Sequence, residues 1–296
     1  MEPSVTEGAA ARTVTLLPDA GLHGRPLHEL QLGDQGGDVM LDLSRLERIE
    51  PLLVVRLAAW MDVQSVNERR VTVIPPERPG IGVCLAAAGI DELQHVGGLA
   101  APGRHTAEAD VLLPLVRLDC EADLVSVVLQ LKDVLEHHSD IELESGRIAM
   151  QQALNELGDN ATTHGANEHG AYVAAMRCAN GRCALAVGDL GVGIPTHMRQ
   201  THGADVGDGE AIERAMLMRA SGTPDQERGV GYRGIVREMT KGAIPHARLR
   251  IWSGGASHSL VVGRGKIRDR CTDPNATPTA GTWVTFEVDA SPVPAC

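Results

Sequence analysis

Two polar residues in the middle of the chain, Glu156 and Asn160, have the types and spacing needed for chemistry on a phosphate. They lie four residues apart in the segment Glu-Leu-Gly-Asp-Asn-Ala, so on a helix they share one face. A carboxylate can act as a general base, and an amide oxygen is a suitable Mg²⁺ ligand. A solvated helix surface can carry the same pair, so this segment needs support from others.

A second segment places an acidic residue directly after an apolar run. Asp189 follows residues 184–187, which read as a strand, and precedes Gly191 and Gly193. A buried carboxylate at a strand end can accept a hydrogen bond from an exocyclic amine, and glycines let the backbone approach a planar base closely. An ordinary turn could use the same residues. The segment is a candidate binding site for a base.

A third segment is a glycine loop that opens a helix. It runs Glu227-Arg228-Gly229-Val230-Gly231, with Gly234 shortly after. Free backbone N–H groups at a helix start can cradle an anion. The Walker pattern GxxxxGK[ST] does not occur in the chain, so a P-loop is excluded. The loop indicates a phosphate site of another kind.

The elements that must position these residues follow from apolar patterning. We expect strands at 112–118, 184–187, 248–252 and 281–288, and helices at 121–136, 148–164 and 211–219. The polar, Gly-rich stretch 201–209 separates them. We therefore expect the α/β fold class. Gly281 and Thr282 lie at the start of the last strand.

In this order the segments resemble the motif boxes of the GHKL superfamily of ATP-binding folds, over about residues 110–290. The resemblance implies a Bergerat-type α/β sandwich, with helices on one face of a mixed sheet, that binds ATP and Mg²⁺. Asn160 would coordinate the metal and Asp189 would read the adenine amine. Residues 196–228 would form a lid. The other implied ATP-binding residues are Gly191, Gly193, Gly229, Gly231, Gly234 and Thr282. Arg233 stands where a third glycine of the second box is usual.

The resemblance is strongest to anti-sigma-factor serine/threonine kinases. Arg228, in an Glu-Arg-Gly context, would meet the γ-phosphate, and Glu156 would activate a water or a partner's hydroxyl as general base. His164 matches the end of the kinases' Asn-box helix. Three alternatives stay open: a slow ATPase or ATP-gated switch, a gyrase-like or chaperone-like clamp, and a histidine kinase-like protein using His137-His138.

The first half of the chain reads strand, helix, strand, helix, at 38–43, 51–60, 70–74 and 83–88, which is typical of a small parallel α/β layer. This order resembles the STAS domain over about residues 12–95. Pro51 and its neighbours stand where an acceptor Ser is usual, so this STAS-like domain is degenerate. Another small α/β domain is the alternative. A breaker-rich stretch, 97–107, predicts domains at 1–105 and 106–296.

The charge and the composition of the chain limit the classes of partner that we expect. The 296 residues carry a formal net charge of −12, which argues against direct nucleic-acid binding. No apolar run is long enough for a membrane span, and the start lacks a signal peptide, so we expect a cytoplasmic protein. The resemblance implies a protein partner such as a sigma factor or an anti-sigma antagonist, and a homodimer is left open.

Two side-chain patterns have competing interpretations. Cys178 and Cys183 flank a turn and could pair across a hairpin, although small apolar residues on paired strands are the favoured interpretation. Basic residues alternate between 264 and 270, which would place them on one strand face to dock an acidic partner. A solvated hairpin is the favoured alternative.

Overall fold

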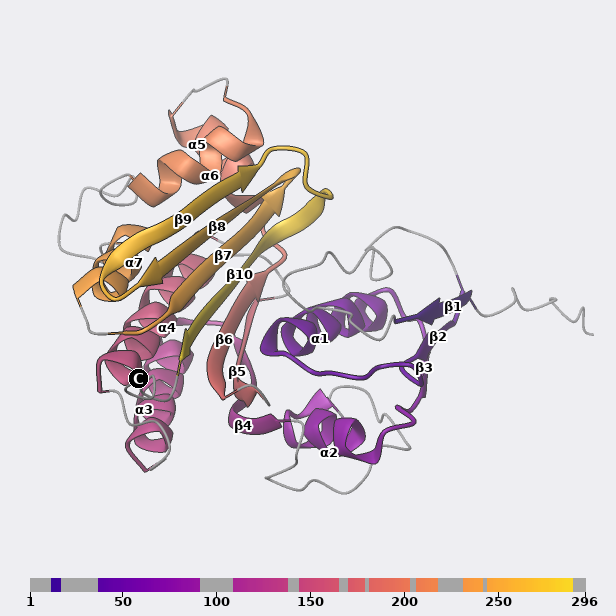
Figure 1. The fold of residues 1–296 in the computed structure, drawn as a ribbon. Helices are drawn as coiled ribbons and strands as arrows, with labels where there is room; N and C mark the ends of the chain where they lie inside the picture. Colours follow the sequence, from indigo (N-terminus) through magenta and orange to yellow (C-terminus); the bar gives the residue numbers. More distant parts are fainter. Residues whose placement is uncertain are drawn as a thin grey trace, which may run out of the picture.

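The computed structural model describes residues 12–16, 37–90, 109–137, 144–164, 170–178, 181–202, 206–217, 231–241 and 244–289. They form two sheets with helices around them (Figure 1). The expected domain boundary at 97–107 lies outside the described residues, so the division into 1–105 and 106–296 stays a prediction.

The larger sheet has seven strands in the order β4-β5-β6-β10-β7-β8-β9. Its described pairings are all antiparallel, so the expected α/β sandwich is confirmed while its sheet is antiparallel where a mixed one was expected. The strands are β4 (Ala109–Leu118), β5 (Ala171–Cys178), β6 (Arg182–Asp189), β7 (Ala247–Gly254), β8 (Ala256–Gly263), β9 (Lys266–Asp273) and β10 (Thr279–Asp289).

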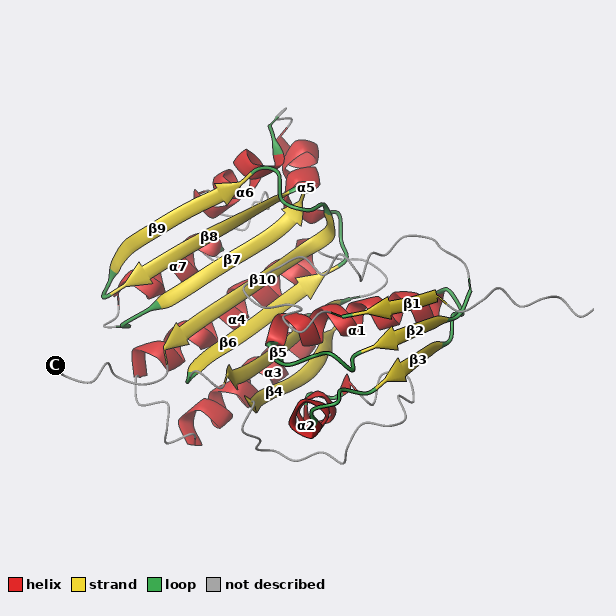
Figure 2. Ribbon diagram, turned by 45° about the vertical axis from the view of Figure 1, so that its right-hand side comes forward, coloured by secondary structure: helices red, strands yellow, loops and turns green. Residues whose placement is uncertain are grey.

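Helices cover one face of this sheet, and we call it the helix face (Figure 2). Apolar residues of α3, α4 and α7 form one core with alternate residues of β5, β6, β7 and β10. These helices span α3 (Glu121–His137), α4 (Glu144–His164) and α7 (Tyr232–Lys241), while α5 (Gly193–His202) and α6 (Asp208–Leu217) lie at one end of the sheet. The helix predicted at 148–164 is α4, which therefore has the sheet beneath it.

A smaller sheet has three parallel strands in the order β1-β2-β3. The parallel pairing of β2 with β3 confirms the strand–helix–strand pattern, whereas β1 was not predicted as a strand. Its elements are β1 (Arg12–Thr15), β2 (Val39–Asp42), α1 (Pro51–Val66), β3 (Val71–Ile74) and α2 (Pro79–Ala87). Parallel pairing requires a crossover, which α1 supplies between β2 and β3. The STAS resemblance itself stays a prediction.

Helix α1 is buried on every side from Pro51 to Met61. One apolar cluster joins α1 both to the small sheet, through residues such as Val39 and Leu41, and to the large sheet, through Tyr172, Ala186 and Trp283. The helix therefore lies between the two sheets and packs on part of the second face of the large one, against β5, β6 and β10 (Figures 1 and 2). We call this second face the open face. This position explains why its sequence has no polar stripe.

The two competing side-chain interpretations are resolved by the strands. Cys178 and Cys183 are both free, which agrees with the favoured interpretation. The alternating basic residues lie on and before β9, which forms an exposed hairpin with β8. A register shift between Val261 and Val262 interrupts the β8–β9 pairing, and Arg268 there donates its Nε–H to the Gly263 carbonyl at 3.2 Å. The single basic face is therefore wrong, because strict alternation fails at a bulge.

No helix in the described part of the chain is both long and apolar enough to cross a membrane.

Candidate functional site

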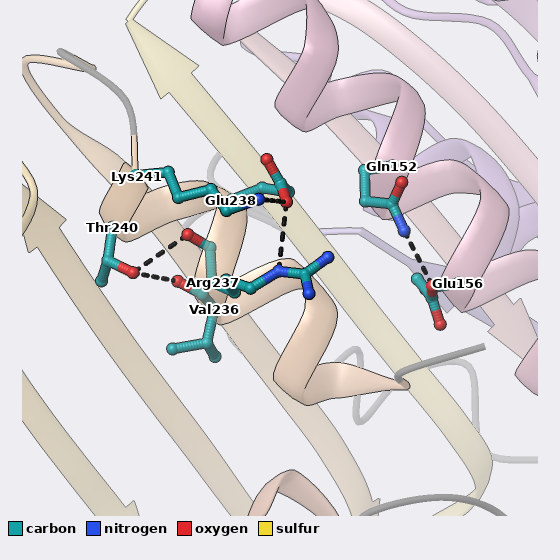
Figure 3. A network of polar contacts seen from close by, with 7 residues as sticks. All are labelled: Gln152, Glu156, Val236, Arg237, Glu238, Thr240 and Lys241. Carbon is teal, nitrogen blue, oxygen red and sulfur yellow. Dashed lines mark hydrogen bonds and ion pairs between the residues drawn. The ribbon is translucent and has the colours of Figure 1, made fainter.

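Glu156 lies on α4 with 4% of its surface exposed, and both of its carboxylate oxygens accept hydrogen bonds. Gln152, one helical turn earlier, donates its Nε2 to Oε1 at 2.7 Å (Figure 3). The backbone N–H of Gly231, just before α7, donates to Oε2 at 2.7 Å. A buried carboxylate needs such partners. Glu156 is thus fixed between α4 and the glycine loop that the sequence predicted.

Asp189 is the last residue of β6 and is 5% exposed. Its Oδ1 accepts the Gly191 N–H at 2.8 Å, and the backbone of Thr282 donates a second bond. Burial raises the pKa of this carboxyl to about 6, against the opposing effect of the two backbone hydrogen bonds. The carboxylate is held by its neighbours and lies on the helix face of the sheet.

Two glycines near Asp189 have no room for a side chain. Gly193 has φ +77°, and a Cβ there would lie 2.8 Å from the Ser253 hydroxyl. Gly281 has φ +69°, and a Cβ there would overlap the Asp189 carbonyl oxygen. The chain can approach β6 this closely only with glycine at both positions. The glycines flanking the carboxylate are therefore structural necessities of the site.

Ser253, at the end of β7, is a residue that the sequence reasoning missed. It is fully buried; its hydroxyl donates to the Gly281 carbonyl at 2.9 Å, accepts the Ile194 N–H at 2.9 Å and lies 3.2 Å from the Thr282 hydroxyl. These bonds tie the start of α5 to the start of β10. A serine near a strand end carries no signal for this role, whereas Gln152 could have been found from its spacing to Glu156.

Asn160 lies one turn after Glu156 on α4, and its Nδ2 is buried without a hydrogen-bond partner. A side-chain amide can present its oxygen to Mg²⁺ and its nitrogen to a phosphate oxygen. The residue therefore fits the metal–phosphate role that the GHKL resemblance implied. Among the described residues, no group of three or more His, Cys, Asp or Glu side chains could hold a metal ion.

Two adjacent residues at the start of α7 bring the predicted carboxylates together. Gly231 bonds Glu156, while the phenol of the buried Tyr232 lies close enough to Asp189 that this charge, after burial itself, raises the tyrosine pKa. Gly234 lies in the first turn of α7, and its N–H donates to the Gly231 carbonyl at 2.8 Å. The N–H of Gly234 is thus occupied within the helix.

The remaining predicted residues are only partly covered. Arg228 and Gly229 lie outside the described residues, as do the side chain of His164 and parts of the expected lid 196–228. The described part of that range belongs to α5 and α6. Asp208 of α6 accepts the Gly255 N–H at 2.7 Å and pairs with Arg199 at 2.9 Å, so these two helices are tied to the β7–β8 turn.

No protein-family model and no curated protein matches the chain. Some solved structures match part of the chain. The B-subunit of the DNA gyrase from Myxococcus xanthus is similar at 16% identity over 37% of this chain and 28% of that one, with a TM-score of 0.21. The 43K ATPase domain of Thermus thermophilus gyrase B, in complex with an aminocoumarin, is similar at 19% identity over 52% of this chain and 38% of that one, with a TM-score of 0.26.

Proposed function

We propose that the chain binds Mg-ATP between α4, the end of β6 and the start of α7. The observation that supports this most directly is that consecutive residues, Gly231 and Tyr232, contact Glu156 and approach Asp189. This supports one site in which Asp189 would read the base and Glu156 would lie at the phosphate end, as the sequence motifs predicted. Asp189 would accept the adenine amine, and Asn160 would bind the metal and a phosphate oxygen.

The protein's own residues would do the following around a bound nucleotide. Gly193 and Gly281 let the start of α5 and the start of β10 pack directly against Ser253 and the Asp189 backbone, which would hold the Asp189 carboxylate in place for a base. Glu156, oriented by Gln152, would accept a proton from a water or a hydroxyl near the terminal phosphate. A bound Mg²⁺ would neutralise phosphate charge.

The Gly231 N–H, now given to Glu156, is the donor that a phosphate oxygen would compete for. If a phosphate oxygen takes it, Glu156 would lose one hydrogen bond that stabilises its charged form, which would raise its basicity toward the attacking group. This exchange links nucleotide binding to the state of the catalytic residue.

We further propose that ATP binding regulates a protein partner by phosphoryl transfer, with Glu156 as base and Arg228 beside the γ-phosphate. A sigma factor or an antagonist of an anti-sigma factor is the class of partner that the kinase-like motifs suggest. The same residues serve an ATP-gated switch without transfer, in which the nucleotide changes only the affinity for the partner.

Radiolabelled ATP separates these two versions. We expect the parent chain to transfer label to a candidate partner, and Glu156→Gln to bind ATP with unchanged affinity but transfer none. The glutamine keeps an oxygen for the Gly231 N–H, so the loop stays in place, and Glu210→Gln, on the exposed side of α6, is the matched control. Nucleotide-dependent capture of the partner without label would refute transfer and favour the switch. Equal transfer by Glu156→Gln and the parent would refute the role of Glu156.

A further inference from the structure

The open face of the large sheet carries a cluster of arginines at the end farthest from Asp189. Arg248 and Arg250 on β7 and Arg182 at the start of β6 surround Glu287 of β10, since strand register places Arg248 opposite Glu287 and Arg250 opposite Thr285. Along the β6–β10 ladder, Arg182 lies seven residues from Asp189, or about 23 Å. This arginine cluster is therefore separate from the nucleotide site.

One carboxylate holds two of these guanidinium groups. Glu287 pairs with Arg182 at 2.7 Å through Oε2 and with Arg250 at 3.2 Å through Oε1. The side chains of Arg250 and Glu287 are 8% and 9% exposed. Both oxygens of Glu287 are therefore committed, and the two guanidinium groups are fixed side by side.

The third arginine is not satisfied. The Nε of Arg248 is buried without a hydrogen-bond partner, and no acidic side chain pairs with its guanidinium among the described residues. The hydroxyl of Thr285, 6% exposed and opposite Arg250, is also unpartnered. Burying such donors without acceptors is destabilising, so two of them on neighbouring strands point to an acceptor group that binds there.

The donors left without a partner give the sign of that group. The three arginines are matched by three carboxylates near them: Glu287, Glu50, which precedes α1 and acts on Arg250, and Asp289, which lies opposite Arg182. Burial and the neighbouring Arg248 lower the pKa of Arg250, while Glu287 and Glu50 oppose that shift. The unpartnered Nε–H of Arg248 and the unpartnered hydroxyl of Thr285 are donors on neighbouring strands, and they fit an anion with several acceptor oxygens.

We propose that this cluster binds a small oxyanion of the phosphate type, with Arg248 and Thr285 as its direct donors and Arg250 beside it. Arg182, 22% exposed, leaves the cluster open to solvent at the sheet end. The anion is either free phosphate or a phosphate group carried by another molecule. The proposal does not depend on ATP binding at the other end of the sheet.

Calorimetric titration with inorganic phosphate at constant ionic strength tests this site. We expect the parent to bind phosphate, Arg248→Gln to bind about tenfold more weakly, and Arg214→Gln, which alters an exposed arginine on α6, to match the parent. A parent that does not respond, or an Arg248→Gln variant that responds like the parent, would overturn the proposal. Any phosphate that binds at the nucleotide site would still be detected with Arg248→Gln and with Arg214→Gln.

Thr285→Val keeps the shape of the side chain and removes the unpartnered hydroxyl. Without phosphate we expect it to unfold at the same or a higher temperature than the parent, and with phosphate to gain less stability than the parent gains. A purely structural hydroxyl would instead make this variant less stable under both conditions. Titration with phosphoserine distinguishes the sources: tighter binding than inorganic phosphate indicates a phosphorylated molecule, and weaker binding indicates the free ion.

Discussion

The two faces of the large sheet treat buried charge in opposite ways. On the helix face, Glu156 and Asp189 are each held by backbone N–H groups from glycines at element ends. On the open face, Arg56 and Arg248 have an Nε with no partner. The difference comes from the backbone. Strand and helix ends leave N–H groups free to bond acids, whereas β6, β7 and β10 lie inside the sheet and spend their backbone groups on pairing.

A carboxylate that backbone donors hold in one orientation can bind a ligand without rearranging. A buried arginine with an unpartnered Nε–H can gain a hydrogen bond when an acceptor binds. Under the two proposals above, the helix face recognises a base and a cation, and the open face recognises an anion. The comparison also distinguishes residues that stabilise the fold from residues that would bind a ligand. Residues that are strained or uncompensated in the protein alone are those expected to gain partners in a complex.

The largest expected effect concerns the close approach on the helix face. Gly281→Ala should lower the free energy of unfolding by about 3 kcal/mol or more, because its Cβ would overlap the Asp189 carbonyl in addition to the cost of positive φ. Gly181→Ala is the control, since it has φ +77° with nothing within 4 Å, and should cost about 1 kcal/mol. Chemical denaturation measures both. Equal losses would mean that backbone conformation alone explains Gly281.

The next effect is the pH dependence that Asp189 brings to stability. Its folded pKa of about 6 is above the ordinary value of 3.8, so the folded chain binds this proton more tightly than the unfolded chain. Asp189 should therefore reduce stability as pH rises from about 4 to 6, by up to about 3 kcal/mol. Asp189→Asn should remove that loss and be more stable than the parent at pH 7.

Denaturation from pH 4 to pH 8 checks this expectation, and Asp208→Asn provides a control of opposite sign. Hydrogen bonds from Gly255 and Arg199 hold the Asp208 pKa below its usual value, chiefly through Gly255. The stabilisation from Asp208 is present at neutral pH and is lost as pH falls through its folded pKa. A parallel pH response in both variants would contradict the distinction between the two carboxylates.

A smaller effect is expected on the open face, where Arg56 stacks on the Trp283 ring at 5.0 Å. Burial lowers the pKa of Arg56 to about 10. Arg56→Met should raise the free energy of unfolding by about 1 kcal/mol, because removing an unpaired buried charge outweighs the lost cation–π contact. Arg250→Met, which breaks a pair with Glu287, should lower it by about 2 kcal/mol. Thermal unfolding of both variants tests whether the two arginines differ in this way.

The sequence predicted much of the helix face because its signals are local. The i,i+4 spacing of Glu156 and Asn160 identified one helix face, and the apolar run before Asp189 identified a strand end. Gln152 follows the same helical spacing and was nevertheless missed. Ser253 could not be found, since its role depends on β7 and β10 meeting across about thirty residues.

The open face could not be read from the sequence. The apolar run from Pro51 to Met61 predicted a helix, but its burial between two sheets depends on contacts with strands more than a hundred residues away. The arginine cluster likewise joins β6, β7 and β10 through their register. The net charge of −12 argued only against nucleic-acid binding, because a global charge does not record where single arginines meet.

Titration of the protein with Mg-ATP by calorimetry tests the central claim most directly. We expect the parent to bind one nucleotide, Asp189→Ala to lose at least about 100-fold in affinity, and Asp110→Ala, on the outer strand β4, to bind like the parent. Asp189→Asn is the sharper variant, since it keeps the size of the side chain and removes the negative charge of the group that would accept a hydrogen bond from the amine. Unchanged affinity in both Asp189 variants, or no binding by the parent, would contradict the account.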